Sequence, residues 1–243
     1  MTDSLYFQSL EKQQMGDGIC LKVLDRMDRL KAMAEGEEQA VLAFEGLYEE
    51  GDHISLKVPQ RNCHYVVQID DVIESSLVYI AEEELIFDIP FGEKKKSWNP
   101  KAFTGEWHYL TCRRAGGRET ESYRNLAKNT LDQQKARGCF PHASANVETR
   151  GESVFAARNA IDGILANHSH GSWPYGSWGI NRREDAEFLL EFGRPVSFDK
   201  IVLWTRADFP HDNWWIQARL EFSDGTGEVV SLKKTERGPM SLS

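Results

Sequence analysis

The sequence contains no long apolar run and no visible targeting segment. A membrane-spanning helix needs about 18 or more consecutive apolar residues, and no stretch of that kind occurs. Residues 1–15 lack the basic region and following apolar core that a secretory signal peptide requires. The sequence therefore predicts no membrane span, and the expected location of the protein is the cytoplasm.

Familiar signatures of catalysis are missing as well. There is no Gly-x-Ser-x-Gly elbow, no phosphate-binding Walker loop and no dinucleotide fingerprint. Glycoside hydrolysis needs two carboxyl groups at a fixed separation across a cleft. The acidic runs of this chain instead resemble turns or mixed-charge surface: Asp70-Asp71, Glu82-Glu83-Glu84 and Glu184-Asp185. We expect a protein without catalytic activity, and a glycan-processing hydrolase or lyase with a site between two domains stays open as an alternative.

Positive charge and clustered cysteines are also scarce. The formal net charge is −9, which argues against a nucleic-acid partner because phosphate backbones are neutralised by Lys and Arg. The four cysteines are widely spaced and form no Cys-x-x-Cys motif. We therefore expect reduced, partly buried thiols rather than a zinc site or a disulfide framework.

The chain does contain many short segments that alternate between apolar and polar residues or are rich in β-branched and aromatic residues. Such segments, separated by turn residues, are typical of antiparallel strands. In the first half they lie at residues 40–44, 53–58, 64–69, 77–80, 85–89 and 107–113. In the second half they lie at residues 188–192, 201–205, 216–222 and 229–232, and Asp224-Gly225 predicts a hairpin turn between the last two.

Two segments are expected to be helical. Residues 20–35 show apolar positions at i, i+3 and i+4, and residues 119–137 contain no Gly or Pro and are rich in helix-forming residues. We therefore predict an all-β protein with two β-sandwich domains, residues 1–115 and 139–243, joined by a helical connector at residues 116–138.

Several segments of the second half occur in a distinctive order. They are Ser144-Ala145, Asn159-Ala160-Ile161-Asp162-Gly163, Leu189-Leu190-Glu191-Phe192-Gly193, Ile201-Val202-Leu203-Trp204-Thr205-Arg206 and Phe222-Ser223-Asp224-Gly225. In this order, over roughly residues 144–232, the chain resembles the discoidin family, the coagulation factor 5/8 type C domain. The resemblance implies a galactose-binding-like β-sandwich (jelly roll) that binds glycans or other surfaces. It also implies that Asp162 lies in a loop that often helps to hold a structural calcium ion.

The first half resembles the accessory jelly-roll domains of glycoside hydrolases. The segments that carry this resemblance are Tyr48-Glu49-Glu50-Gly51-Asp52 and Trp98-Asn99-Pro100. It implies a second β-sandwich and adds no residues to the candidate site.

The densest group of ligand-binding residue types lies between two predicted strands, at residues 206–215. Sugar recognition needs flat aromatic faces for C–H surfaces and polar groups for hydroxyls, and binding residues concentrate on loops of rigid sandwiches. The candidate residues here are Arg206, Asp208, His211, Asn213 and Trp214. Adjacent Trp214 and Trp215 cannot both point inward from a strand, so at least one is expected near the surface or in an interface.

A second loop, residues 168–178, adds His168 and Trp173 as candidate glycan contacts. Its His168-Ser169-His170 pair also invites a metal interpretation, but the glutamate that a cupin-like site needs is not found in the following residues.

The sequence thus predicts a non-catalytic protein that binds a carbohydrate or glycoconjugate through loops of the second sandwich. A protein-interaction or assembly module, including a homo-oligomer with aromatic residues at its interface, remains a further alternative.

Overall fold

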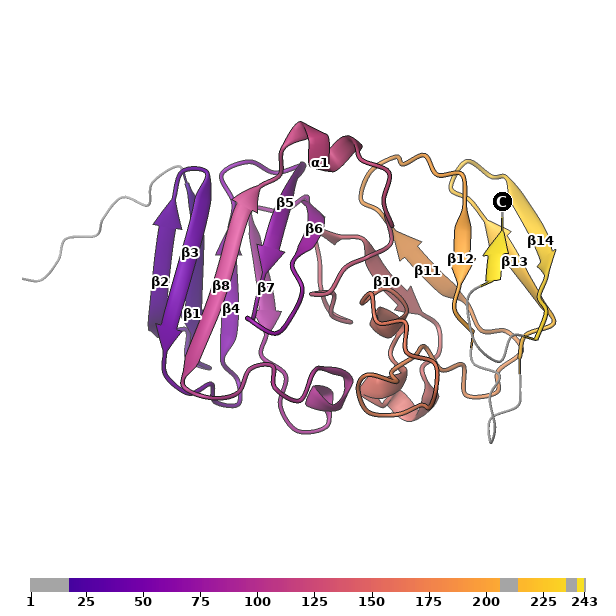
Figure 1. Ribbon diagram of the computed structural model, residues 1–243, viewed down its shortest axis with the longest axis horizontal. Coiled ribbons are helices and arrows are strands. Elements are labelled where there is room, and N and C mark those ends of the chain that lie inside the picture. The colour runs from indigo at the N-terminus through magenta and orange to yellow at the C-terminus, as the bar shows by residue number, and fades with distance from the viewer. Residues whose placement is uncertain (1–17, 206–213, 235–239, 243) are drawn as a thin grey trace, which may run out of the picture.

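The computed structural model describes residues 18–205, 214–234 and 240–242. Its regular structure is mostly β, and all strand pairs are antiparallel, which confirms the all-β prediction. The strands form two groups that follow each other along the long axis (Figure 1). Within the described residues, no helix has the length and apolarity to cross a membrane.

The N-terminal half, residues 18–116, contains two antiparallel sheets. One has the strand order β2-β1-β4-β7, and the other has the order β3-β8-β5-β6 with the short strand β9 added from the C-terminal half. The strands are β1 Ile19–Leu24, β2 Leu30–Gly36, β3 Gln39–Glu45, β4 His53–Lys57, β5 Cys63–Gln68, β6 Ser76–Ile80, β7 Glu84–Asp88, β8 Trp107–Arg114 and β9 Cys139–Phe140.

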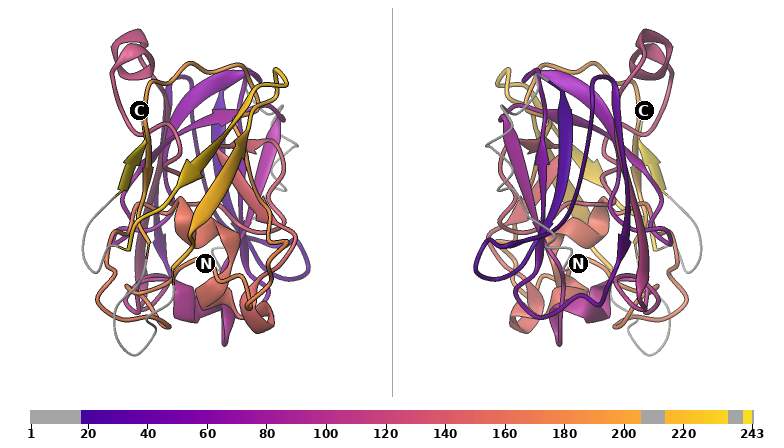
Figure 2. Two further views of the ribbon diagram at one scale, coloured as in Figure 1. Left: turned by 90° about the vertical axis from the view of Figure 1, so that its right-hand side faces the viewer. Right: turned by 90° about the vertical axis from the view of Figure 1, so that its left-hand side faces the viewer.

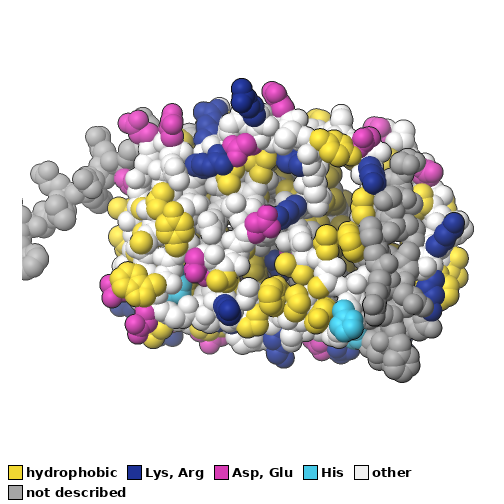
Figure 3. Space-filling model, in the orientation of Figure 1, with side chains coloured by type: hydrophobic (Ala, Val, Ile, Leu, Met, Phe, Trp, Pro, Cys, Tyr) yellow, Lys and Arg dark blue, Asp and Glu magenta, His cyan; other side chains and the backbone are white. Residues whose placement is uncertain are grey.

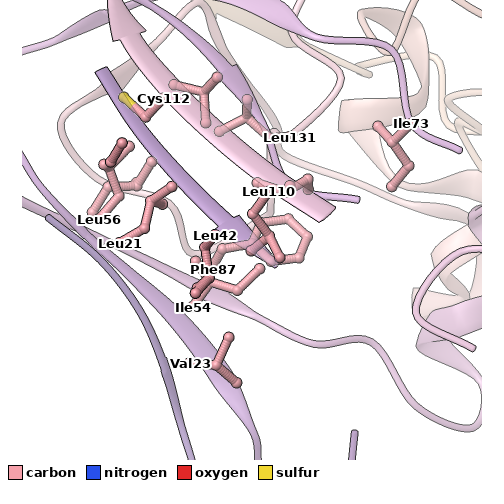
Figure 4. Close-up of a cluster of buried hydrophobic side chains, with 14 of the residues drawn as sticks. Leu21, Val23, Leu42, Ile54, Leu56, Ile73, Phe87, Leu110, Cys112 and Leu131 are labelled. Carbon is pink, nitrogen blue, oxygen red and sulfur yellow. The ribbon is translucent and has the colours of Figure 1, made fainter. Parts of the chain in front are cut away.

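One hydrophobic core holds these two sheets together. Successive side chains of a strand point to opposite faces, and β3 follows this rule, with Leu42 and Phe44 buried and Val41 exposed. Side chains from both sheets meet in the space between them (Figure 4), as Leu21 and Leu110 illustrate. Burying a large apolar side chain contributes about 1.5–3 kcal/mol, so this core is the main source of stability of the N-terminal half.

The helix predicted for residues 20–35 is wrong, because this segment forms the β1–β2 hairpin. Its turn is built by Asp25, whose carboxylate oxygen Oδ1 accepts hydrogen bonds from the backbone N–H groups of Met27 and Arg29 at 2.8 and 3.0 Å. Asp28 adopts a positive φ of 59° there, a conformation that aspartate tolerates better than most residues. The apolar residues of this strand-turn-strand segment are therefore spaced three and four positions apart by coincidence.

The long helix predicted for residues 119–137 is also wrong. Only α1, Gly117–Glu121, is helical, and the rest of the connector is a chain of turns. Asn125 and Asn129 each accept a hydrogen bond from the backbone N–H two residues later, at 3.0 and 3.1 Å. Such local bonds compete with helical hydrogen bonding, and Leu131 is buried in the N-terminal core (Figure 4).

The connector is hydrogen-bonded to both halves through two neighbouring residues. The backbone N–H of Asn129 donates to the carbonyl oxygen of Ile161 at 2.8 Å in the C-terminal half. The backbone N–H of Thr130 donates to Ser76 Oγ at 2.8 Å, and its hydroxyl donates to the Glu74 carbonyl at 2.7 Å, both in the N-terminal half. The segment is therefore an internal part of the structure.

The C-terminal half, residues 139–242, consists of antiparallel pairs and short 3-10 turns. The pairs are β10-β11, β12-β15 and β13-β14, and the last pair confirms the predicted hairpin. Seen end-on, this hairpin lies across the outer end of the molecule (Figure 2). The elements are β10 His142–Ala145, η2 Thr149–Gly151, η3 Ser153–Phe155, η4 Ala157–Ala160, β11 Phe188–Glu191, β12 Ile201–Leu203, β13 Gln217–Glu221, β14 Gly227–Ser231 and β15 Met240–Leu242.

The two halves also meet at the lower edge of Figure 1, where η1, Lys94–Ser97, lies against η3. The backbone N–H and the hydroxyl of Ser153 donate to the Glu93 carboxylate at 2.9 and 3.1 Å. All four cysteines are free, and three of them are buried, as the sequence predicts.

Candidate functional site

The two loops selected from the sequence meet at a pair of tryptophans. Trp178 closes the 168–178 loop, and Trp215 closes the 206–215 segment. Their ring centroids are 5.5 Å apart at an interplanar angle of 71°, an edge-to-face contact. This geometry is favourable for aromatic pairs, so the ends of the two loops form one surface.

Trp178 is the fixed member of this pair. Its indole N–H donates to the carbonyl oxygen of Val147 at 2.9 Å, and its ring lies 5.1 Å from that of Phe188 on β11. It is also one of the half-buried residues that pack against a small buried cluster of the C-terminal half. Trp215 therefore packs against a ring that is held in place by a hydrogen bond and by its contact with Phe188.

Trp214 and Trp215 both reach solvent, with exposed fractions of 42% and 36%. This agrees with the expectation that at least one of them lies near the surface. The ammonium of Lys234 lies 5.5 Å from the Trp214 ring centroid, within the range of a cation–π interaction. The other candidates of this segment, Arg206, Asp208, His211 and Asn213, lie outside the described residues.

His168 and Trp173 lie on the neighbouring loop. The His168 ring is exposed and sits 6.1 Å from the Tyr175 ring. Trp173 is half-buried, and its backbone N–H donates to the Lys96 carbonyl of η1 at 2.8 Å. In the described part of the chain, no hydrogen bond or ring contact joins either residue to Trp214.

Asp162 occupies a buried turn rather than an open loop. Its carboxylate oxygen Oδ1 accepts a hydrogen bond from the backbone N–H of Ile164 at 2.8 Å, and its exposed fraction is only 9%. Burial raises the pKa of Asp162 to about 6, and the nearby positive charge of Arg158 limits this rise. The carboxyl group is thus partly protonated at mildly acidic pH.

These surroundings fit a calcium ion poorly. A bound cation would lie close to the buried guanidinium of Arg158, and like charges in a buried site repel strongly. Across the residues that the structure describes, no group of three or more His, Cys, Asp or Glu side chains is placed to hold a metal ion. Calcium at Asp162 stays a prediction of the family resemblance.

A second aromatic surface lies on the outer face of the five-stranded sheet and was not selected from the sequence. Trp107 and Tyr109 on β8 are 65% and 44% exposed, and they point to the same side because they are two residues apart. Hydrophobic side chains are visible over this part of the sheet (Figure 3). Alternation alone does not tell which face of β8 is buried, since both faces carry apolar residues.

The polar groups at the junction of the two halves are hydrogen-bonded to one another and to the backbone. Arg158 donates from Nε to the Asp132 carbonyl at 2.7 Å and from Nη1 to Asn159 Oδ1 at 3.1 Å. The Asp132 carboxylate binds His142 Nδ1 at 2.7 Å and accepts the backbone N–H of Ala143 at 3.0 Å. The hydrogen bond and charge of Asp132 raise the pKa of His142. These side chains bind one another and the backbone, as buried polar networks do.

Comparison with family models, with curated proteins and with solved structures gives no match for this chain.

Proposed function

We propose that the protein binds carbohydrate without turning it over, through the aromatic loop surface of the C-terminal half. We define this surface by Trp214, Trp215, Trp173 and His168. The contact between Trp178 and Trp215 carries the proposal, because it places exposed indoles on an anchored support. The apolar C–H faces of a pyranose ring stack on such rings, and prepositioned aromatic side chains lose little entropy on binding.

We further propose that the C-terminal half is a galactose-binding-like sandwich and the N-terminal half a jelly roll. The antiparallel pairs β10-β11, β12-β15 and β13-β14 support the first assignment. The two sheets that enclose one core support the second. In such sandwiches, loops at one end carry the ligand while the strands hold them in place.

The proposal is tested by screening the full-length protein on a glycan array and then measuring the affinity of the best ligand by titration calorimetry. Replacing Trp214 with Ala should weaken binding about tenfold, which corresponds to about 1.4 kcal/mol. Trp204→Ala is the matched control, because Trp204 is 41% exposed in the same half and lies outside the aromatic loop surface. A parent protein that retains no glycan, or a Trp214→Ala variant with unchanged affinity, contradicts the proposal.

Absence of turnover is tested separately with chromogenic glycosides and with the bound glycan itself. We expect the glycan to be recovered intact after prolonged incubation. Release of a reducing end or of an unsaturated product would favour the glycan-processing alternative.

A second candidate function, a protein-interaction or assembly module, is favoured by apolar side chains exposed on the strands and loops of the C-terminal half. The exposed fractions are 74% for Ile216, 60% for Val229, 55% for Leu189 and 42% for Val202. Contiguous exposed apolar surface often marks an interface. Size-exclusion chromatography with light scattering separates the two candidates: a dimer that dissociates in the Ile216→Ser variant supports assembly, whereas a monomer at all concentrations supports carbohydrate binding alone.

A further inference from the structure

A basic cluster lies on the outer face of the five-stranded sheet, on strands β5 and β6. His64 on β5 faces Tyr79 on β6 across the ladder, with ring centroids 5.3 Å apart. The next residues along the strands, Tyr65, Val78 and Ile80, are buried, so both rings point outward. Arg194 follows β11 and lies over this pair. Its Nε donates to His64 Nε2 at 3.2 Å, and its guanidinium carbon is 5.7 Å from the Tyr79 ring centroid.

A second arginine belongs to the same cluster. Arg124 of the connector is half-buried and donates from Nη1 to the Thr120 carbonyl at 3.1 Å. Burial, and after it the charge of Arg194, lowers the pKa of Arg124. Burial and the charges of both arginines likewise lower the pKa of His64, which favours the neutral ring that accepts the Arg194 hydrogen bond.

These two arginines differ from Arg113 because neither has a carboxylate partner among the described residues. Arg113 binds both carboxylate oxygens of Glu119, at 2.8 and 2.6 Å. Neither Arg124 nor Arg194 forms an ion pair with any described residue, although the whole chain has a formal net charge of −9. Basic side chains are visible together at the upper edge of this face, near α1 (Figure 3).

A half-buried guanidinium group that has no anionic partner is costly, since it loses part of its hydration and repels other positive charges. The Arg194 side chain is held in place by His64 and by the Pro195 carbonyl, which Nη1 contacts at 3.1 Å. This leaves its Nη2 without a hydrogen-bond partner among the described residues. A guanidinium with a free edge is well suited to bind a planar or tetrahedral oxyanion.

We propose that Arg194 binds an oxyanion, with His64 and Tyr79 orienting its guanidinium group and with the charge of Arg124 adding to the attraction. The ligand class is a carboxylate or sulfate group borne by a sugar. That a sugar carries the anion rests on the proposed function, whereas the anion site itself does not. The site gives the protein a preference for acidic over neutral glycans.

The experiment titrates the full-length protein with three probes by calorimetry: inorganic sulfate, an oligosaccharide of galacturonic acid, and its neutral galactose counterpart. Variants Arg194→Gln and Arg124→Gln should each weaken binding of the two anionic probes about tenfold or more. Arg118→Gln is the control, because Arg118 is an exposed arginine of α1 outside the cluster, and it should bind like the parent. Thermal melting of every variant in chloride confirms that it is folded, and Arg194→Lys replaces Arg194→Gln if the latter does not fold.

The anion site and its link to acidic sugars give different results in this experiment. Tighter binding of the acidic oligosaccharide than of its neutral counterpart, lost in both arginine variants, supports the whole proposal. Binding of inorganic sulfate alone supports the anion site and overturns its link to sugars. Equal binding of both anionic probes by the parent and the two arginine variants overturns the site. Trp214→Ala should retain anion binding. A loss of glycan binding in Trp214→Ala with unchanged sulfate binding therefore concerns the aromatic loop surface and not the anion site.

Sulfate also stabilises folded proteins by exclusion from their surface. Any rise in the melting temperature must therefore exceed the rise seen in Arg194→Gln at the same sulfate concentration. The affinity should fall as sodium chloride is added, since part of the attraction is between charges near the surface.

Discussion

The guanidinium of Arg158 lies 3.9 Å from the centroid of the Trp98 ring, so a charged side chain of the C-terminal half is stacked on an aromatic residue of the N-terminal half. Both residues are 6% exposed. Cation–π contacts strengthen when they are shielded from water. This pair therefore contributes more to the junction of the halves than a surface ion pair would.

Arg158→Ala should destabilise the protein by about 3–5 kcal/mol, because two buried carbonyl oxygens and Asn159 Oδ1 lose the Arg158 donor and Trp98 loses its packing partner. The free energy of unfolding is measured by urea denaturation. Arg150→Ala is the control, since the Arg150–Glu152 pair is at the surface and its loss should have a much smaller effect. Equal effects of the two changes would show that the buried contacts of Arg158, with Trp98 and with its hydrogen-bond partners, do not stabilise the protein more than a surface ion pair does.

Asp162→Asn should stabilise the protein at neutral pH. The pKa of Asp162 is raised to about 6 in the folded state, compared with 3.8 when unperturbed. Its contribution to stability is therefore fully present below pH 3.8 and is lost as the pH rises through 6. The ionised form costs on the order of 3 kcal/mol, which asparagine avoids while it still accepts the Ile164 hydrogen bond. Urea denaturation of parent and variant should differ at pH 7 and agree near pH 4; a difference that does not change with pH contradicts this prediction.

Calcium should leave the melting temperature unchanged, because the Arg158 charge opposes a cation beside Asp162. Binding to the native state alone at about a hundred times the Kd would add about 2.7 kcal/mol, which scanning calorimetry detects easily. Magnesium at the same concentration controls for ionic strength. A rise with calcium that is absent in Asp162→Asn would instead establish the site that the discoidin resemblance implies.

Gly193→Ala should destabilise the protein strongly. Gly193 has a φ of 64°, and a Cβ atom there would lie 2.3 Å from Cδ2 of Phe140. Left-handed backbone costs a non-glycine residue about 1–2 kcal/mol, and the ring must also move, which costs about 1–3 kcal/mol more. Gly225→Ala is the matched control, since Gly225 has a φ of 86° and no atom within 4 Å of the added Cβ. Similar melting temperatures for the two variants would show that the Phe140 ring can move aside without a measurable loss of stability.

The strands could be predicted from the sequence wherever alternation and turn residues agreed. The predicted strands at residues 53–58 and 85–89 correspond to β4 and β7, which pair with each other in one sheet. The prediction failed at residues 20–35 because two short strands and a turn carry apolar residues at helical spacing by chance. It failed at residues 119–137 because helix propensity counts little when asparagine side chains satisfy the backbone and Leu131 gains a buried position.

The candidate site was only partly predictable for a different reason. Residue types marked out the two loops, but the contact of Trp178 with Trp215 depends on how distant segments pack. The basic cluster gave no sequence signal, because His64, Arg124 and Arg194 come from three separate parts of the chain. Local patterns report strands and loops, whereas surfaces assembled from remote segments need the tertiary structure.

Asn129 is hydrogen-bonded to the C-terminal half and Thr130 to the N-terminal half, so the chain cannot be cut beside the connector without losing contacts. A fragment that ends at residue 116 would lose the Thr130 partner of Ser76 and the Leu131 side chain that fills its core. A fragment that begins at residue 139 would lose the Asn129 amide, which donates to the carbonyl oxygen of Pro141 at 2.8 Å. Neither piece is self-sufficient, so heating should melt the chain in one cooperative transition instead of two independent ones.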